Sequence, residues 1–495
     1  MAEKDAMGTP AQSGFFGVPI CFHQGLLLNG GERANKAVSH LHVLMPEKKR
    51  DIMHKNLCSV TYLLTTHDAE TSVSAVSGRE GSCVGDVSGC SGKPGDLACF
   101  LIWERGRRRE DDMLSALEAR FRILGDYEVV WESEHLMQDL SRLYEKNAPR
   151  NADRALAKVG RPPFRFVLVE DTSPRYTWVR SVSQLVEPAN ADVISLKEEF
   201  RSWFHEKYQV HSSTNMRECL YQSVLILGVD NLEKALGGIE RVKKLLDKDL
   251  EGCHGWYDWA HFFSVMNRCV DYLVLYDFEG LPAFLDADAI TFLCDDLLRF
   301  KAAANLKREK GRAERYLLVV GGKQFSVYVR VVGDGYFDTK WQIRMLSNRR
   351  FTGDLYVPTI EDHFFGLLYH ALIHEGGVTR RRSKQLNGLV REMGLDWLKP
   401  QAMRDTLAAC SILSGFMIPN GYSYTKPLDP GVKGNLKARL QLPSPSSVRA
   451  GLIGQRLLGK LGRFVLLPGR EKTQVIGRMA KKILLSPWAR RQENQ

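Results

Sequence analysis

The sequence predicts an α/β domain followed by an α+β domain whose C-terminal part is helical. Short apolar runs alternate with stretches of helical spacing from residue 97 to about 230. Two further apolar runs flank a Gly-Gly turn at 321–322, and mostly helical patterns follow as far as Gly421. Alternating strands and helices are typical of α/β layers, whereas a hairpin followed by helices is typical of α+β architecture.

Length and composition narrow the class of protein. The chain has 495 residues, enough for about three domains, and 44% of them are hydrophobic, so most of the chain can bury a core. No uninterrupted apolar run approaches the roughly 18 residues that span a bilayer, and the N-terminus lacks the basic start of a secretory signal. None of the ten cysteines shows C-x-x-C spacing. We therefore expect a cytoplasmic protein with reduced thiols.

The net charge of +11 is concentrated at the C-terminus. Residues 431–495 contain 14 Lys and Arg but only Glu471 and Glu493, which gives +12, so residues 1–430 carry −1. Proteins that follow a nucleic-acid backbone normally distribute basic patches over the folded surface. A nucleic-acid partner is therefore disfavoured. The same argument disfavours an enzyme that adds nucleotides to the ends of RNA.

These patterns predict four regions. They are a poorly ordered leader with a Gly/Ser linker (1–95, linker 72–95), an α/β domain (96–230), an α+β domain with a helical extension (231–430) and a basic amphipathic tail (431–495).

The expected elements of the first domain follow in order. They are strand 98–103, helix 112–124, strand 127–131, helix 135–144, strand 164–169, helix 195–208 and a strand-to-helix junction at 209–215. Residues 229–270 look helical because apolar side chains from Leu232 to Leu246 fall on one face.

The junction at 209–215 is the best-marked site of the first domain. Asn215 followed by Glu218 forms a capping-box pattern, and His211 and Thr214 stand just before it. Free N–H groups at such a helix end can bind phosphate or carboxylate. His211, Thr214 and Asn215 are therefore candidate substrate-binding residues, although the same residues could simply cap the helix.

In the second domain we expect strands at 272–276 and 289–294, a hairpin at 315–332 and a helix at 359–375. Thr359 and Asp362 form a capping pair for that helix, and Gly376 ends it. His370 and His374 lie on one stripe of the helix. The histidines either line a cleft, are buried with hydrogen-bond partners, or bind a metal with a ligand from elsewhere.

Several segments of the second domain resemble the sequence motifs of a known family. They are 278–282, 290–296, Arg330 with 333–338, Trp341, 356–358, 367–374 and 421–430. In these segments the chain resembles the nucleotidyltransferase-fold proteins found among bacterial surface-polysaccharide genes. Residues 100–103 and 211–215 resemble sequence motifs of an upstream α/β domain in such proteins. The resemblance therefore covers about 335 residues. It implies a nucleotidyltransferase-like fold for the second domain.

The resemblance also implies a metal site. Nucleotidyltransferases hold metal ions with a D-x-D pair on one strand and a third carboxylate on the neighbouring strand. Here Ala289 and Thr291 occupy the positions of the pair, and Tyr328 occupies that of the third carboxylate. Asp286 and Asp288 form a D-x-D slightly earlier. Either Mg²⁺ binds at this shifted pair, or the site has lost its metal.

Function is expected from the same resemblance. An active protein would be a transferase that moves a nucleotidyl or phosphoryl group from a nucleotide or sugar phosphate to a sugar or polyol. Asp286 and Asp288 would bind Mg²⁺, Asp334 would position or deprotonate the acceptor, and Arg330, His370 and His374 would contact substrate. The alternative is a catalytically degenerate scaffold that binds a nucleotide or glycan in polysaccharide biosynthesis, so enzymatic activity stays open.

The tail from 449 to 488 places apolar and basic residues on different helical stripes. Such a segment suits an interfacial helix on anionic lipid, which would make the protein peripheral at the inner membrane face. A disordered or internally packed tail is the alternative.

Overall fold

The structure, a computed structural model, describes residues 95–145, 151–180, 186–238, 240–309, 315–395, 398–432 and 434–445. All of these described residues belong to one compact unit. The expected leader and linker up to residue 94 and the tail segment 449–488 lie outside the described residues. Among the described helices, none is long and apolar enough to cross a membrane.

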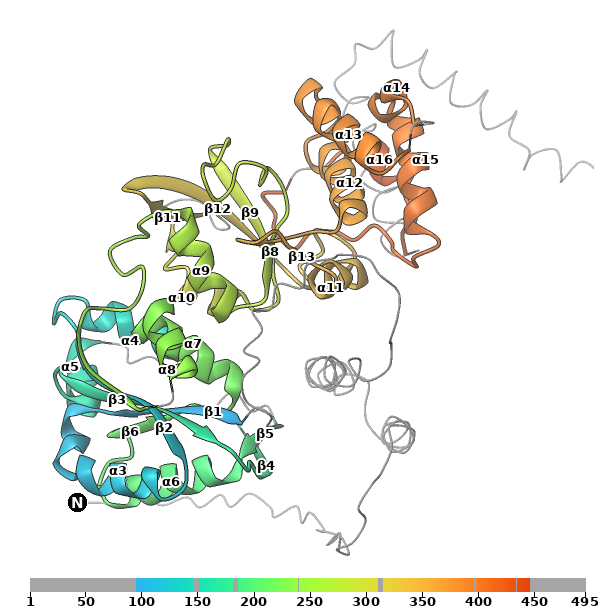
Figure 1. Cartoon of the computed structure of the whole chain (residues 1–495). Helices are drawn as coiled ribbons and strands as arrows, with labels where there is room; N and C mark the ends of the chain where they lie inside the picture. The colour runs from blue at the N-terminus through green and yellow to red at the C-terminus, as the bar shows by residue number, and fades with distance from the viewer. Residues whose placement is uncertain are drawn as a thin grey trace, which may run out of the picture. The chain divides into compact units, whose positions relative to one another are not determined.

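The first sheet has five strands in the order β6-β1-β3-β2-β7 (Figure 1). Their bounds are β1 (Asp96–Ile102), β2 (Arg122–Val130), β3 (Phe164–Asp171), β6 (Val210–Ser212) and β7 (Val242–Asp247). β3 lies antiparallel between β1 and β2, and α3 (Glu110–Glu118) connects β1 to β2. These elements form a split β-α-β unit, which agrees with the predicted alternation of strands and helices.

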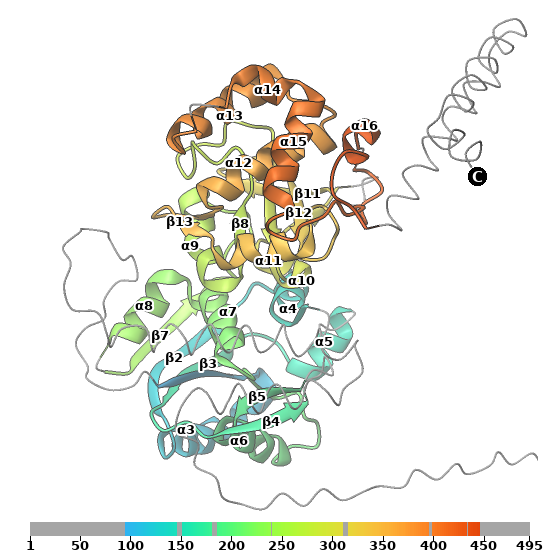
Figure 2. The same cartoon turned by 90° about the vertical axis from the view of Figure 1, so that its right-hand side faces the viewer.

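Helices cover both faces of this sheet. α3 and α6 (Ala191–Ser202) cover one face and lie side by side (Figure 2), where they enclose Phe100 and Ile102. α4 (Leu136–Tyr144), α7 (Met216–Leu227) and α8 (Val229–Gly237) pack on the other face, with Cys99 and Leu101. Successive residues of β1 therefore enter different cores, as the two-residue period of a strand requires. The remaining elements of this part are η1 (Glu104–Arg109), α5 (Ala152–Val159), β4 (Tyr176–Arg180) and β5 (Val186–Asn190).

The prediction of helix throughout 229–270 is wrong. The segment contains α8, then β7 paired parallel to β2, then α9 (Trp259–Cys269). Gly237 and Gly238 stand at the end of α8, and glycine is a poor helix former. Leu246 is buried on the sheet, so apolar spacing that matched a helix belongs in part to a strand.

The second sheet has the order β10-β11-β12-β9-β8. Its strands are β8 (Tyr272–Val274), β9 (Ala289–Cys294), β10 (Lys307–Arg308), β11 (Arg315–Val320) and β12 (Lys323–Val331). β11 and β12 form the predicted hairpin, and Gly321 and Gly322 both have positive φ at the turn. β9 pairs parallel with β12 and antiparallel with β8, so the sheet is mixed.

One hydrophobic core joins the two sheets. α9 packs on α7, and α10 (Leu297–Ala303) packs on α4. Side chains from β1, α7, α9 and β9 belong to the same buried cluster, which includes Leu101, Val224, Phe262 and Phe292. The guanidinium of the buried Arg142 on α4 donates to the main-chain oxygens of Ala302 and Ala303, the last two residues of α10.

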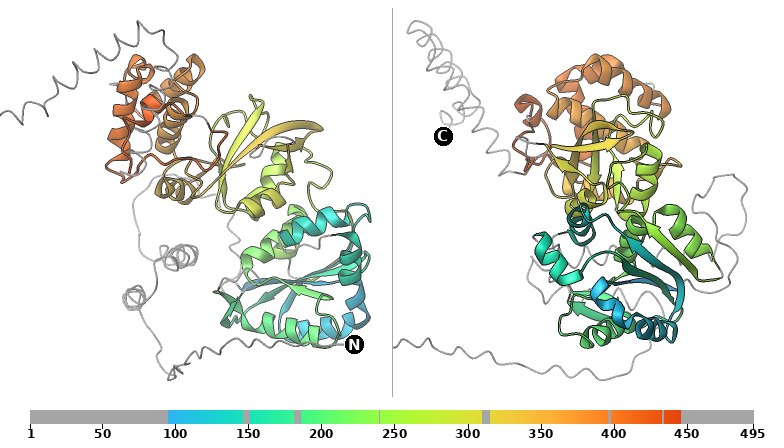
Figure 3. Two further views of the ribbon diagram at one scale, coloured as in Figure 1. Left: turned by 180° about the vertical axis from the view of Figure 1, so that it is seen from behind. Right: turned by 90° about the vertical axis from the view of Figure 1, so that its left-hand side faces the viewer.

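The C-terminal part is built of helices, as expected, and its described residues from 360 onward are drawn in orange (Figure 3). The helices are α11 (Thr339–Ser347), α12 (Ile360–Tyr369), the π-helical turn η3 (His370–His374), α13 (Arg380–Glu392), α14 (Pro400–Arg404), α15 (Thr406–Met417) and α16 (Leu436–Arg439), with the short strands β13 (Arg350–Phe351) and β14 (Tyr356–Val357). A second core packs these helices on Leu273 and Leu293 of the second sheet. The protein is thus a mixed α/β molecule with a helical C-terminal part.

Candidate functional site

The register of β9 and β12 brings the expected metal-binding positions together. Tyr328 pairs with Thr291, and Ala289 pairs with Ser326. The alternate residues of both strands, such as Ile290 and Val327, enter the core shared by the two sheets. Ala289, Thr291 and Tyr328 therefore share the opposite face, which we call the open face of the second sheet. All three positions on that face are neutral.

Arginines flank the tyrosine on this face. The guanidinium carbons of Arg315 and Arg330 each lie 6.0 Å from the centre of the Tyr328 ring. Arg330 is buried, forms an ion pair of 3.1 Å with Asp429, and lies 4.3 Å above the ring of Tyr336. Arg315 forms an ion pair of 2.9 Å with Glu309, so both guanidinium charges are partly compensated by carboxylates. Their remaining N–H groups can donate to an anion and cannot bind a metal ion.

The aspartates expected to bind Mg²⁺ precede β9. Asp286 and Asp288 are both exposed, in the loop that leads into the strand. The main-chain oxygen of Asp286 accepts a hydrogen bond of 3.1 Å from Arg381, and that of Asp288 accepts one from Ser326.

Asp334 has a structural position in the loop after β12. Its carboxylate accepts hydrogen bonds from the main-chain N–H groups of Val331 and Tyr336 and from the Gln342 amide at 2.7 Å. These contacts hold the loop in place. A role for Asp334 as a base would require some of them to break.

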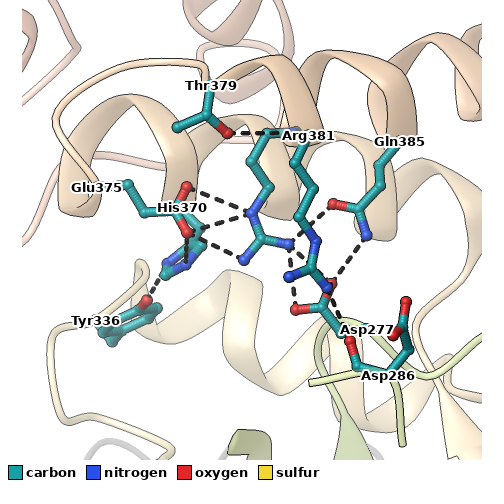
Figure 4. Close-up of polar contacts among 9 residues, drawn as sticks. Asp277, Asp286, Tyr336, His370, Glu375, Thr379, Arg381 and Gln385 are labelled. Carbon is teal, nitrogen blue, oxygen red and sulfur yellow. Dashed lines mark hydrogen bonds and ion pairs between the residues drawn. The ribbon is translucent and has the colours of Figure 1, made fainter. Parts of the chain in front are cut away.

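A network of carboxylates and arginines lies beside Asp286 (Figure 4). Arg382 on α13 donates to Asp277 at 3.0 Å and to Glu375 at 3.0 Å. Arg381 and Gln385 also donate to Asp277. Arg381 is the accessible member, with 57% of its side chain exposed. We call Asp277, Arg330, Tyr336, His370, His374, Glu375, Arg381 and Arg382 the central polar cluster.

His370 and His374, both predicted to contact substrate, lie against Tyr336. His370 interacts with the Tyr336 hydroxyl through Nδ1 and with Glu375 through Nε2 at 3.1 Å. A carboxylate only accepts, so Nε2 carries the proton and Nδ1 accepts from the tyrosine. The ring of His374 stacks on Tyr336 with centroids 4.1 Å apart. The π-helical turn that carries both histidines is a feature frequent at functional sites.

Electrostatics fix the charge states in this cluster. Burial would raise the pKa of Glu375, but hydrogen bonds from His370 and Arg382 outweigh burial and lower this pKa to about 2. Burial lowers the pKa of His370 and lowers that of His374 to about 3. Glu375 is therefore ionised at neutral pH while both imidazoles are neutral.

Two buried polar atoms of the cluster have no hydrogen-bond partner among the described residues. They are Nε of Arg330 and Nδ1 of His374, and both side chains contact Tyr336. Buried polar groups are nearly always satisfied by protein, water or ligand. A bound polar ligand or water would satisfy them here.

The candidate residues of the first domain form a different site. Asn215 caps α7 by accepting from the N–H of Glu218, and Glu218 accepts from the N–H of Thr214, so the predicted capping is confirmed. His211 on β6 bonds to Gln222, and burial lowers its pKa to about 4. The structure brings these residues together at the N-terminus of α7, where the Glu218 carboxylate accepts from the N–H of Thr214, just before the N-cap.

Potential metal ligands gather elsewhere. Among the described residues, two groups of side chains lie close enough to hold a metal ion: His135, Asp249, Cys253 and His254, and the exposed group Glu132, Glu134 and His135. Asp286 and Asp288 belong to neither group. The structure thus contains candidate metal ligands without identifying Mg²⁺.

Sequence patterns missed several members of the central polar cluster. Asp277 and Arg382 are 105 residues apart, and no short motif connects them. A local sign of Asp277 would have been its position directly after an apolar strand, and Arg382 belongs to a run of three arginines. A run of three arginines is typical of a solvated surface, yet Arg382 is buried.

Comparison with known proteins adds nothing to these geometric observations. No protein-family model, curated protein sequence or solved structure matches the chain.

Proposed function

We propose that this protein is a nucleotidyltransferase-like member of a surface-polysaccharide assembly system that binds a nucleotide or sugar phosphate at the open face of the second sheet. The observation that carries the proposal is the pair Arg315 and Arg330 on both sides of Tyr328, where a metal-binding carboxylate would otherwise stand. Arginine suits phosphate because its planar fork donates two parallel hydrogen bonds.

The same arrangement favours binding over transfer. Metal-assisted transfer needs carboxylates that clamp the ions between donor and acceptor. Positions 289, 291 and 328 supply none, and Asp286 and Asp288 lie in the exposed loop before the strand. We therefore favour the degenerate scaffold over Mg²⁺-dependent transfer through the shifted pair.

Ligand binding with and without Mg²⁺ tests the proposal. We expect a nucleoside triphosphate or a nucleoside diphosphate sugar to bind the full-length protein with little dependence on Mg²⁺. Arg315→Ala should weaken binding by at least about tenfold, because it removes one of the two guanidinium groups beside Tyr328. Arg391→Ala, on the exposed end of α13, is the control and should change nothing.

Two results would contradict the proposal. If neither ligand binds, the proposed phosphate site does not exist. Mg²⁺-dependent turnover that Asp286→Ala or Asp288→Ala abolishes would show instead that the shifted pair is an active metal site.

A further inference from the structure

A second cluster of chemically reactive side chains lies far along the chain from the central polar cluster. The loop between β7 and α9 carries Asp249, Cys253 and His254, and His135 stands at the N-terminus of α4. One ligand atom from each of these four residues lies within 4.8 Å of the others.

The distances suit a single metal ion. Oδ2 of Asp249 lies 2.9 Å from Nδ1 of His135 and 3.2 Å from Nε2 of His254. The two imidazole rings are nearly perpendicular, with centroids 4.5 Å apart. Zn²⁺ bonds of about 2.0 to 2.3 Å in a tetrahedron separate neighbouring ligand atoms by about 3.3 to 3.8 Å, so small adjustments of these side chains would complete the shell.

The ligand types select the class of metal. Two imidazoles, one thiol and one carboxylate match the nitrogen, sulfur and oxygen ligands that Zn²⁺ takes in proteins. Mg²⁺ and Ca²⁺ prefer shells made of oxygen, and soft thiolate ligands disfavour them.

The surroundings hold the ligands in position. Asp249 is almost fully buried, and its other oxygen accepts from the N–H of Glu132 at 2.8 Å. The main-chain oxygen of Cys253 accepts from Gln138 and Asn305. Metal sites in proteins commonly have such supporting hydrogen bonds around their ligands.

A buried carboxylate supplies a second observation. Asp139 on α4 is fully buried and interacts with Cys253, and its Oδ1 has no hydrogen-bond partner among the described residues. An unsatisfied buried carboxylate oxygen is costly unless a cation or donor compensates for it. Arg142 already places one positive charge near this carboxylate, and a divalent ion at the neighbouring thiol would add the second.

A route to the site exists. A cavity of about 950 Å³ is lined by Asp249, Cys253 and His254 and extends to Gly321 and Gly322 at the β11–β12 turn. His254 is 62% exposed at this opening, whereas Asp249 and Cys253 are buried. Metal could therefore enter past His254.

From these observations we propose that His135, Asp249, Cys253 and His254 form a site for Zn²⁺ or a similar first-row divalent metal ion. The ion would fasten the loop between β7 and α9 to the start of α4. This site is separate from the open face of the second sheet, and the inference does not depend on the proposed function.

Metal titration of the chelator-treated full-length protein tests the site. We expect one tightly bound Zn²⁺ per chain, a higher melting temperature with Zn²⁺, and no competition from excess Mg²⁺. Co²⁺ should give the visible bands of a tetrahedral site together with a thiolate-to-cobalt charge-transfer band.

Variants assign the ligands. Cys253→Ser should remove the thiolate band and weaken Zn²⁺ binding by at least about a hundredfold, and His254→Ala should weaken it by at least about tenfold. Because His254 is exposed, its variant should fold even if Cys253→Ser does not. Cys410→Ser in α15 and His205→Ala on the surface are the matched controls.

Two outcomes would overturn the inference. One is the absence of stoichiometric Zn²⁺ binding by the wild-type protein. The other is Zn²⁺ binding that His254→Ala and Cys253→Ser both leave unchanged, which would place the ion on other residues of the chain.

Discussion

Glu375 shows how one residue holds the central polar cluster together. Its carboxylate accepts from His370 on η3 and from Arg382 on α13. These contacts fix the orientation of the imidazole, which in turn accepts from Tyr336. The charge on Glu375 therefore orients a tyrosine hydroxyl that the carboxylate does not touch.

Glu375→Gln should remove a pH-dependent part of the stability. The pKa of Glu375 is about 2 in the folded protein and 4.5 as its ordinary value, so ionisation stabilises the fold above pH 4.5. That stabilisation is lost as the pH falls from about 4.5 towards 2. At 1.36 kcal/mol per pH unit it amounts to at most about 3 kcal/mol, and solvent screening reduces it. Denaturant unfolding of both proteins at several pH values measures the difference, which should be largest at pH 7 and shrink by pH 3.

Glu233→Gln is the matched control for this experiment. Glu233 pairs with Arg268 on the surface, and exposed ion pairs contribute about 1 kcal/mol or less. A stability difference for Glu375→Gln that stays constant from pH 7 to pH 3 would contradict the assigned pKa.

For single residues, interactions between near neighbours in the chain could be predicted from the sequence, and interactions between distant residues could not. The caps by Asn215 and Thr359 involve partners three residues away, so the spacing alone indicates them. Asp277 meets Arg382 only because the loop after β8 folds against α13, and the sequence carries no pattern for that pair. The group at His135 and Asp249 depends in the same way on tertiary contact.

Among the structural elements, the loop after β12 links the sheet to the C-terminal segment. The N–H of Leu428 donates to the main-chain oxygen of Asp334, and the Thr425 hydroxyl donates to that of Gly335. The loop carries Tyr336 into the central polar cluster. Its close packing leaves no space for a side chain at Gly335.

Gly335→Ala should destabilise the protein by about 2 kcal/mol or more. Gly335 has φ of +74°, and an added Cβ would lie 2.4 Å from the main-chain oxygen of Lys426. Gly415→Ala is the matched control, because Gly415 lies exposed within α15 with nothing within 4 Å of such a Cβ. That change should stabilise the protein by up to about 1 kcal/mol. Thermal unfolding of both variants should show shifts of opposite sign, and equal melting temperatures would contradict the packing described here.

Element prediction succeeded where turn residues marked the boundaries. The β11–β12 hairpin was predicted because Gly321 and Gly322 separate two strand-like runs. In the segment predicted as helix 112–124, the structure instead ends α3 at Glu118 and begins β2 at Arg122. Apolar residues of adjacent elements there continued one apparent period, so spacing could not locate the change from helix to strand.

For the whole molecule, the shared core makes the two sheets depend on each other. Val224 of α7 and Phe262 of α9 are fully buried members of one cluster that reaches both sheets. Separating the sheets would expose these faces to water, at a cost of about 25 cal/mol for each Å² of apolar surface. We therefore expect the described region to unfold as one cooperative unit.

Arg142→Ala tests this expectation, because Arg142 bridges the parts built on the two sheets. Its guanidinium donates to the main-chain oxygens of Glu251, Ala302 and Ala303, and the substitution would leave these acceptors without a charged donor. The loss should exceed about 3 kcal/mol, or roughly a hundredfold in the unfolding equilibrium. Amide hydrogen exchange should then show β3 and β12 losing protection by the same factor, whereas Arg175→Ala on the exposed surface should leave both unchanged. Loss of protection in one sheet alone would show instead that the two parts unfold independently.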